Sequence, residues 1–170
     1  MLEGSSSVCS VMAWNFKFSE AFDSGGGGSV GFFSFGGTQP GGQSLCLDIY
    51  ADSLVAGNHF DSATCNSTGA QKFVLTPAGA PDTFTVSPAA NPSLCLDIPG
   101  AQYSEGGAVH LAACSKSSTQ QWTVAGGVLR SHGNPAYCLD VRAADPSSGA
   151  LVDIAACNGT AAQKFTLFSY

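Results

Sequence analysis

The sequence predicts an all-β fold made of three similar repeats that follow an N-terminal extension. Three observations support this prediction. The segment Ser-Leu-Cys-Leu-Asp-Ile at 44–49 recurs at 93–98 and, in shorter form, at 137–141. In each copy a second cysteine follows 19 residues after the first, and a Gln-x-aromatic segment closes the copy. Within each copy the apolar residues alternate with a period of two, which is typical of short β-strands.

The expected strands are short alternating segments separated by clusters of Gly, Pro, Asn and Ser. In the second repeat they cover 84–86, 94–98, 109–111 and 121–124. Four strands in each of three repeats give about twelve strands, and no helical period of useful length interrupts them. Because one repeat cannot bury its own apolar face, the three repeats must close around a shared core. This arrangement is a three-fold β-trefoil.

The closing segments predict both core positions and turn contacts. They are Gln71-Lys72-Phe73, Gln120-Gln121-Trp122 and Gln163-Lys164-Phe165. We expect the three aromatic residues to occupy equivalent places in the core, because large aromatic side chains bury the most apolar surface. We expect the three leading glutamines to hold turns by hydrogen bonds to the backbone.

Six of the seven cysteines lie in the repeats as three equivalent pairs. Their spacing lacks the close C-x-x-C pairs of metal sites, and nucleophilic catalysis would need one special cysteine. Six cysteines allow many pairings, of which pairing within each repeat is the simplest. The predicted disulfides are Cys46–Cys65, Cys95–Cys114 and Cys138–Cys157. Disulfides indicate an oxidising compartment, so we expect a secreted, extracellular protein.

Two sequons agree with secretion and mark possible N-glycosylation at Asn66 and Asn158. The first residues lack the basic start and uninterrupted apolar core of a secretory signal. We therefore expect the chain to be a mature or processed form.

Composition excludes several classes of protein. Six basic and twelve acidic residues give a net charge of −6, which would repel nucleic acid. Only 11% of residues are charged and 44% are hydrophobic, unlike a disordered acidic segment. No apolar run is long enough to span a membrane.

The predicted domain boundaries separate an arm at 1–29 from a trefoil at 30–170, with repeats at about 30–76, 82–125 and 126–170. The arm contains the alternating aromatic residues Trp14, Phe16 and Phe18, which suit a strand, and a Gly-rich linker at 24–29. It either folds back over an apolar patch of the trefoil or docks on another chain. Cys9 has no partner in the repeats, so it is either a free thiol or, as we prefer, an interchain disulfide to a protein partner.

The three copies of Cys-Leu-Asp-Ile/Val, the cysteine 19 residues later and Gln-x-Trp/Phe resemble the ricin B-type lectins over about residues 30–170. These lectins are carbohydrate-binding β-trefoils. The resemblance implies a shallow sugar site in each repeat. It is formed by the Asp of Cys-Leu-Asp, a polar residue four before the second cysteine and the residue after that cysteine. The implied positions are Asp48, Asp61 and Asn66, then Asp97, His110 and Ser115, then Asp140, Asp153 and Asn158.

The sequence departs from the lectin pattern at two kinds of position. The aromatic platform that stacks on the sugar is replaced by Ala63, Ala112 and Ala155, and the Asn before each closing Gln is replaced by Ala70, Thr119 and Ala162. Stacking is lost, and the facing carboxylates of repeats one and three would repel each other unless a cation or donor intervenes.

Tyr103 is a candidate substitute platform in the second repeat, beside Asp97 and His110, and Tyr50 is a similar candidate in the first; the alternative is that these loop tyrosines have no part in binding. The second repeat is therefore the best candidate site. A competing interpretation gives the retained Asp residues a structural role, accepting backbone N–H groups of the following turn.

Enzyme chemistry finds no support in the motifs. His59, His110 and His132 follow no metal-binding spacing, and there is no G-x-S-x-G segment. We expect no cofactor, metal or catalytic activity. Two hypotheses remain: a secreted carbohydrate-binding module that binds glycans or polysaccharide weakly and multivalently, and a structural or assembly subunit that uses the trefoil and the arm as a protein interface.

Overall fold

The computed structural model describes residues 28–38 and 42–170. Within these residues the secondary structure consists of β-strands and short 3₁₀ turns, and no helix there is long and apolar enough to cross a membrane. The strand expected around Trp14, Cys9 and the first four residues of the linker lie outside the described residues, so what is expected of them stays a prediction. So does the protein interface proposed for the arm.

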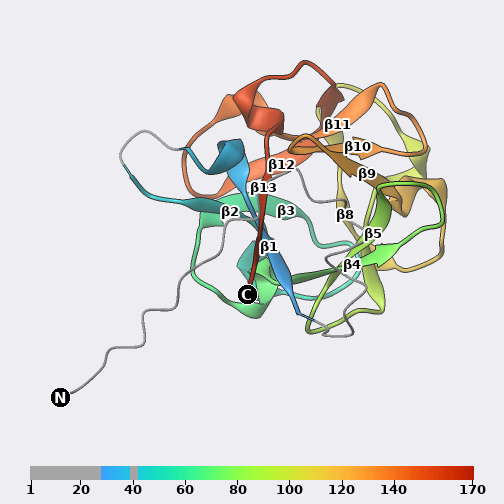
Figure 1. Ribbon diagram of the computed structural model, residues 1–170, viewed down its shortest axis with the longest axis horizontal. Coiled ribbons are helices and arrows are strands. Elements are labelled where there is room, and N and C mark those ends of the chain that lie inside the picture. The colour runs from blue at the N-terminus through green and yellow to red at the C-terminus, as the bar shows by residue number, and fades with distance from the viewer. Residues whose placement is uncertain (1–27, 39–41) are drawn as a thin grey trace.

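Six strands form a barrel. They are β1 (Val30–Phe33), β4 (Phe73–Pro77), β5 (Thr83–Pro88), β9 (Trp122–Ala125), β10 (Val128–Ser131) and β13 (Thr166–Ser169). Antiparallel pairing runs from β13 to β1, β4, β5, β9 and β10 in turn. The first and last strands are therefore neighbours, as Figure 1 shows, and the Tyr170 N–H donates to the Ser29 carbonyl at 2.9 Å.

Three further hairpins, one in each repeat, complete the trefoil. They pair β2 (Leu45–Ile49) with β3 (Phe60–Thr64), β6 (Leu94–Asp97) with β8 (His110–Ala113), and β11 (Tyr137–Val141) with β12 (Ala150–Ala156). In the second repeat Val109 separates β8 from a short strand β7 (Gly107–Ala108), which pairs with β12. The described residues consequently contain thirteen strands where the sequence predicted about twelve.

Each hairpin carries one disulfide, which confirms the pairing predicted from the repeat. The bonds join Cys46 to Cys65, Cys95 to Cys114 and Cys138 to Cys157. Each bridge fixes the first strand of a hairpin to the end of the second, so the hairpin that carries the candidate site is held covalently.

The repeats are joined to one another by equivalent backbone hydrogen bonds. In each, a glycine N–H donates to a carbonyl of the following repeat, and the third repeat donates back to the first. The glycines have φ angles of 89°, 70° and 91°, a region that glycine enters without strain. The bonds run from Gly57 to Leu111, from Gly106 to Ile154 and from Gly149 to Ser62, at 2.7, 2.9 and 2.8 Å.

The core confirms the prediction for the closing aromatic residues. Phe73, Trp122 and Phe165 are fully buried, and all three belong to one hydrophobic cluster. The Trp122 indole satisfies its N–H by donating to the Leu96 carbonyl at 3.2 Å, as a buried indole requires.

Each repeat contains two 3₁₀ turns at equivalent positions. One set follows the first hairpin strand, at η2 (Tyr50–Asp52), η4 (Pro99–Ala101) and η6 (Arg142–Ala144). The other precedes each closing aromatic residue, at η3 (Gly69–Gln71), η5 (Ser118–Gln120) and η7 (Ala161–Gln163). The remaining turn, η1 (Ser34–Gly37), follows β1.

The closing glutamines hold turns, as predicted. Each Oε1 accepts the N–H of the residue after the second cysteine, and each Nε2 donates to the carbonyl of the residue before that cysteine. The first bond measures 2.8, 2.8 and 2.9 Å and the second 3.1, 3.0 and 2.9 Å for Gln71, Gln120 and Gln163.

Candidate functional site

Each hairpin brings two of the sequence-predicted site residues face to face. The strand register sets Asp48 opposite Asp61, Asp97 opposite His110 and Asp140 opposite Asp153. Side chains of directly opposed residues project from the same face of the sheet, so each couple forms one local site. We call these three couples the facing pairs. Their repetition allows one repeat to be compared directly with another.

The facing pair of the second repeat is the more solvent-exposed one. The Asp97 side chain is 14% exposed and the His110 side chain 27%, with 3.6 Å between Asp97 Oδ2 and His110 Nε2. The other carboxylate oxygen, Oδ1, accepts a 2.6 Å hydrogen bond from the Thr119 hydroxyl. Thr119 stands where the lectin pattern has Asn, and the sequence predicted that this position no longer contributes to the site. The structure shows that its hydroxyl still orients the carboxylate.

In the facing pair of the third repeat, one carboxylate, that of Asp153, is bound by an arginine. Arg142 donates from Nε to Asp153 Oδ2 at 2.6 Å and from Nη2 to the Gly106 carbonyl at 3.0 Å. Burial raises the pKa of Asp153, which is opposed by the bond to Arg142. Burial also raises the pKa of Asp140 to about 6. Sequence reasoning missed Arg142, although a basic residue two positions after the Asp of Cys-Leu-Asp was a visible signal.

The facing pair of the first repeat has a different environment. Asp48 and Asp61 are 7% and 6% exposed, and the Oδ1 atom of each is buried without a hydrogen-bond partner. Burial, followed by the charges of Asp61 and Asp52, raises the pKa of Asp48 to about 7. Burial also raises the pKa of Asp61, against the effects of Asp48 and His59. Within the described part of the chain, no lysine or arginine forms a salt bridge with either carboxylate.

The first Asp of each facing pair does not hold the turn that follows it. The N–H groups that close η2, η4 and η6 donate to backbone carbonyls, from Ser53 to Tyr50, from Gln102 to Pro99 and from Asp145 to Arg142, and Asp97 accepts from the Thr119 hydroxyl. The alternative interpretation, in which these Asp residues accept backbone N–H groups of the next turn, is therefore not supported by the geometry. Their carboxylates remain directed to other side chains.

The two tyrosines expected near the sites differ in exposure. Tyr50 is 50% exposed, and its ring stacks on His59 with 4.4 Å between centroids. Tyr103 is half-buried and packs against the core. Its ring lies 5.8 Å from that of Tyr137, and its hydroxyl accepts a long 3.5 Å bond from Ser131, so these contacts are with the third repeat. Its use as a sugar platform stays a prediction.

The predicted positions Asn66 and Asn158 lie in the turns that follow Cys65 and Cys157. Asn66 and Asn158 are exposed, and their side-chain oxygens accept the backbone N–H of Thr68 at 3.0 Å and Thr160 at 2.9 Å. Their sugar contacts and glycosylation stay predictions. The alanines at the platform positions, Ala63, Ala112 and Ala155, lie opposite the first cysteine of each disulfide.

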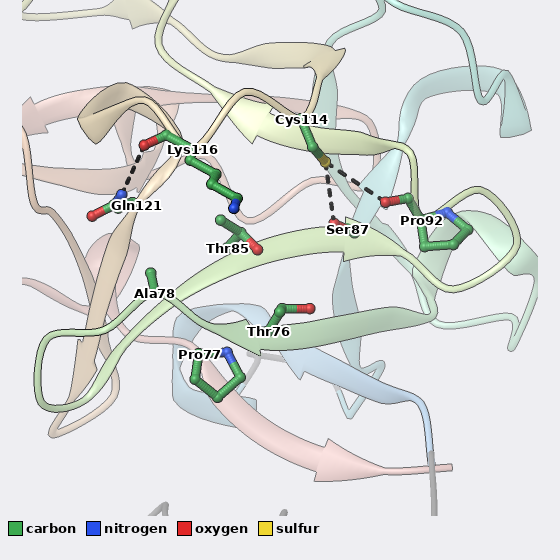
Figure 2. Close-up of a pocket in the computed structure, with 9 residues that line it drawn as sticks. All are labelled: Thr76, Pro77, Ala78, Thr85, Ser87, Pro92, Cys114, Lys116 and Gln121. Atoms are coloured by element: carbon green, nitrogen blue, oxygen red, sulfur yellow. Dashed lines mark hydrogen bonds between the residues drawn. The ribbon is translucent and has the colours of Figure 1, made fainter.

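A pocket of about 510 Å³ lies away from these positions, between the β4–β5 hairpin and the segment after Cys114. Figure 2 shows the hydroxyls of Thr76, Thr85 and Ser87 at its wall and the Lys116 amino group over Thr85. None of the residues that the sequence assigned to a sugar site lines it. In the described residues, no group of three or more His, Cys, Asp and Glu is placed to hold a metal ion.

The sequence matches two family models. One is the ricin-type β-trefoil lectin domain over residues 82–169, and the other is the ricin-type β-trefoil lectin domain-like family over residues 13–112. No curated protein matches.

Solved structures with a similar fold include a designed three-fold symmetric protein, ThreeFoil, at a TM-score of 0.73 and 20% identity, covering 83% of this chain and 99% of that one. The C-half of an earthworm R-type lectin in complex with GalNAc has a TM-score of 0.67 and 16% identity, covering 84% and 99%. An exo-β-1,3-galactanase from Clostridium thermocellum has a TM-score of 0.72 and 16% identity, covering 86% of this chain and 31% of that one.

Proposed function

Because the chain belongs to the ricin-type β-trefoil lectin family, we propose that it is a secreted carbohydrate-binding module whose surviving neutral-sugar site lies in the second repeat. The observation that carries this assignment is the exposure of the Asp97–His110 pair, at 14% and 27% of the side chains. As whole residues Asp97 and His110 are of intermediate exposure, whereas the four Asp residues of the other facing pairs are buried, each at most 8% exposed. Sugar hydroxyls need polar partners that reach the surface, and the second repeat offers them.

The chemistry of the second repeat suits a sugar hydroxyl. The Thr119 hydroxyl donates a hydrogen bond to Asp97 Oδ1 and so fixes the orientation of the carboxylate. The other oxygen, Oδ2, faces His110 and is the one we expect to accept from a sugar hydroxyl. His110 supplies a ring nitrogen that donates or accepts according to its protonation. A hydrogen bond from a sugar hydroxyl to an ionised carboxylate is stronger than one to a neutral acceptor.

The missing aromatic platforms make each site weak. Aromatic contacts add about 0.5–1.5 kcal/mol beyond the area buried, so their loss costs up to about tenfold in affinity. Useful binding then depends on several sites engaging a repetitive polysaccharide at once. The likeness to part of a galactanase chain supports a role as an accessory module beside another domain or partner, and the three disulfides support an extracellular setting.

A glycan array followed by titration of the best neutral ligand tests the proposal. We expect millimolar binding that Asp97→Ala weakens by about tenfold, because the variant removes the oriented acceptor. Asp82→Asn is the matched control, since it removes one exposed carboxylate on the β4–β5 turn. Absence of binding to any glycan at millimolar concentration, or equal binding by both variants, refutes the proposal.

A further inference from the structure

The three facing pairs show what each carboxylate site uses to offset its charge. In the second repeat the partner of Asp97 is an imidazole, and in the third repeat Asp153 binds the Arg142 guanidinium. The first repeat has two carboxylates, and no lysine or arginine of the described chain is bonded to either. Two of the three equivalent sites therefore have a nitrogen-bearing side chain in salt-bridge contact with a carboxylate, whereas in the first His59 acts on Asp61 without such a contact.

The residue that supplies the cation in the third repeat has an aromatic counterpart in the first. Arg142 begins η6 directly after the first hairpin strand, and Tyr50 begins η2 at the same place. In place of a guanidinium, the first repeat presents a half-exposed ring stacked on His59. An aromatic face beside carboxylates is a surface that suits a ligand with both a cation and an apolar face.

The third repeat shows a cation bonded to a buried carboxylate at the equivalent position of the fold. In the third repeat the Asp153 side chain is only 2% exposed, yet its Oδ2 receives Arg142 Nε at 2.6 Å from a side chain that is 48% exposed. Asp48 and Asp61 are buried to a similar depth. A positive group carried by an exposed side chain therefore bonds a carboxylate at this position of the fold, and in the third repeat the arginine itself contributes to the burial.

Electrostatics favour such a group. Each carboxylate of the first pair has an oxygen with no hydrogen-bond partner. Asp48 also faces the charges of Asp61 and Asp52, whereas the pKa of Asp61 is lowered by its hydrogen bond with Asp48, by the charge of His59 and by a backbone hydrogen bond. Buried like charges stabilise a counter-charge placed between them. A divalent metal is less suitable, because the described residues offer no group of three ligands.

We propose that the first repeat binds a cationic amino sugar, an unacetylated hexosamine unit of a polysaccharide, with its ammonium at the Asp48–Asp61 pair and the apolar face of its ring toward Tyr50. This inference rests on the proposed carbohydrate-binding function and gives the first repeat a ligand class of its own. The ammonium takes the place that the guanidinium of Arg142 has in the third repeat.

Paired titrations with glucosamine tetramer and its fully N-acetylated form, and with the galactosamine equivalents, test this inference at pH 7 and low salt. We expect the unacetylated form to bind about tenfold more tightly, with the preference falling as salt rises or as the pH is lowered to 5. Asp61→His, which copies the pair of the second repeat, should abolish the preference. Asp82→Asn, which removes the same charge elsewhere, should leave it unchanged.

A second pair of variants moves the site between repeats. Tyr50→Arg should fill the first pair with an internal guanidinium and remove amine binding, whereas Arg142→Tyr should give a second amine site and raise the stoichiometry from one to two. Equal affinity for both forms, or a preference that survives Asp61→His, overturns the inference. If neutral-sugar binding that depends on Asp97 persists in that case, only the amino-sugar assignment fails. If no sugar binds, the proposed function fails with it.

Discussion

Gln120 accepts the backbone N–H of Ser115 at 2.8 Å across the turn that follows the Cys95–Cys114 disulfide. The same side chain donates to the Ala113 carbonyl at 3.0 Å, so one buried amide satisfies the backbone on both sides of Cys114. Removing such a side chain leaves backbone groups unpaired, which costs more than the bond itself contributes.

Gln120→Ala should therefore lower the free energy of unfolding by about 1–3 kcal/mol. Gln121→Ala is the matched control, because its side chain is partly exposed and makes one bond, to the Lys116 carbonyl. Urea unfolding followed by circular dichroism compares the two. Equal losses in both variants would show that the buried amide has no special role.

The disulfide of each hairpin should contribute independently. Replacing Cys95 and Cys114 by alanine should cost about 3 kcal/mol, because the bridge closes a loop of roughly 20 residues in the unfolded chain. The Cys46/Cys65 double variant should cost a similar amount, since its separation is also 19. Thermal unfolding with and without reductant measures both. If reductant lowered the unfolding temperature of the double variants as much as that of the natural protein, the removed disulfide would make no contribution of its own, which would contradict the prediction.

The raised pKa values of the carboxyl groups in the first and third facing pairs predict a stability that falls as pH rises. The pKa of Asp48 is about 7 and that of Asp140 about 6 in the folded protein, against 3.8 as the ordinary value. Between the ordinary pKa and the raised pKa of each group, the folded state binds more protons than the unfolded state. The free energy of unfolding therefore decreases with increasing pH over that range. Asp145, whose pKa is lowered, makes the free energy of unfolding rise with pH instead, and it does so at lower pH.

Urea midpoints measured from pH 4 to pH 8 check this trend. Asp48→Asn should flatten the slope between about pH 4 and pH 7, because the group that takes up the proton is gone. Asp82→Asn should retain the slope of the natural protein. A natural protein that becomes more stable across this range would show that the buried carboxylates do not carry raised pKa values.

Gly31 on β1 is predicted to be intolerant of any side chain. A Cβ at this position would lie 2.3 Å from the ring of Phe168 on β13, which is itself buried. Gly31→Ala should destabilise the fold by about 1–3 kcal/mol through overpacking. Gly69→Ala is the control, since its nearest neighbour would be Ala90 at 3.8 Å. Chemical unfolding of both variants decides, and similar midpoints would refute the steric argument.

The sequence predicted those parts of the structure that recur within a repeat. Three copies of one pattern identified the disulfides, the buried aromatic residues and the glutamine contacts, because each copy supports the other two. Those features depend on residues close together in the chain. The cross-strand contact between Asp97 and His110 followed from the same pattern.

The contacts between repeats were not predictable in the same way. Arg142 bonds to Gly106, 36 residues earlier, and Tyr103 packs toward Tyr137 of the next repeat. These contacts depend on how the repeats close around the core, and a one-dimensional pattern does not contain that geometry. The charge environment is a further example: Arg142 reaches Asp153 in the third repeat, whereas Tyr50 stands at the equivalent position of the first, and the repeat pattern does not say which side chain folds over the pair.

The antiparallel pairing of β1 with β13, completed by the bond from Tyr170 to Ser29, makes the trefoil closed in a topological sense. The junction between the third and first repeats is bridged by the same kinds of contact as the other two. Joining residues 29 and 170 through a short peptide and opening the chain at an exposed inter-repeat turn should therefore give a circular permutant with the same fold. The order in which the repeats are synthesised is not encoded in their packing.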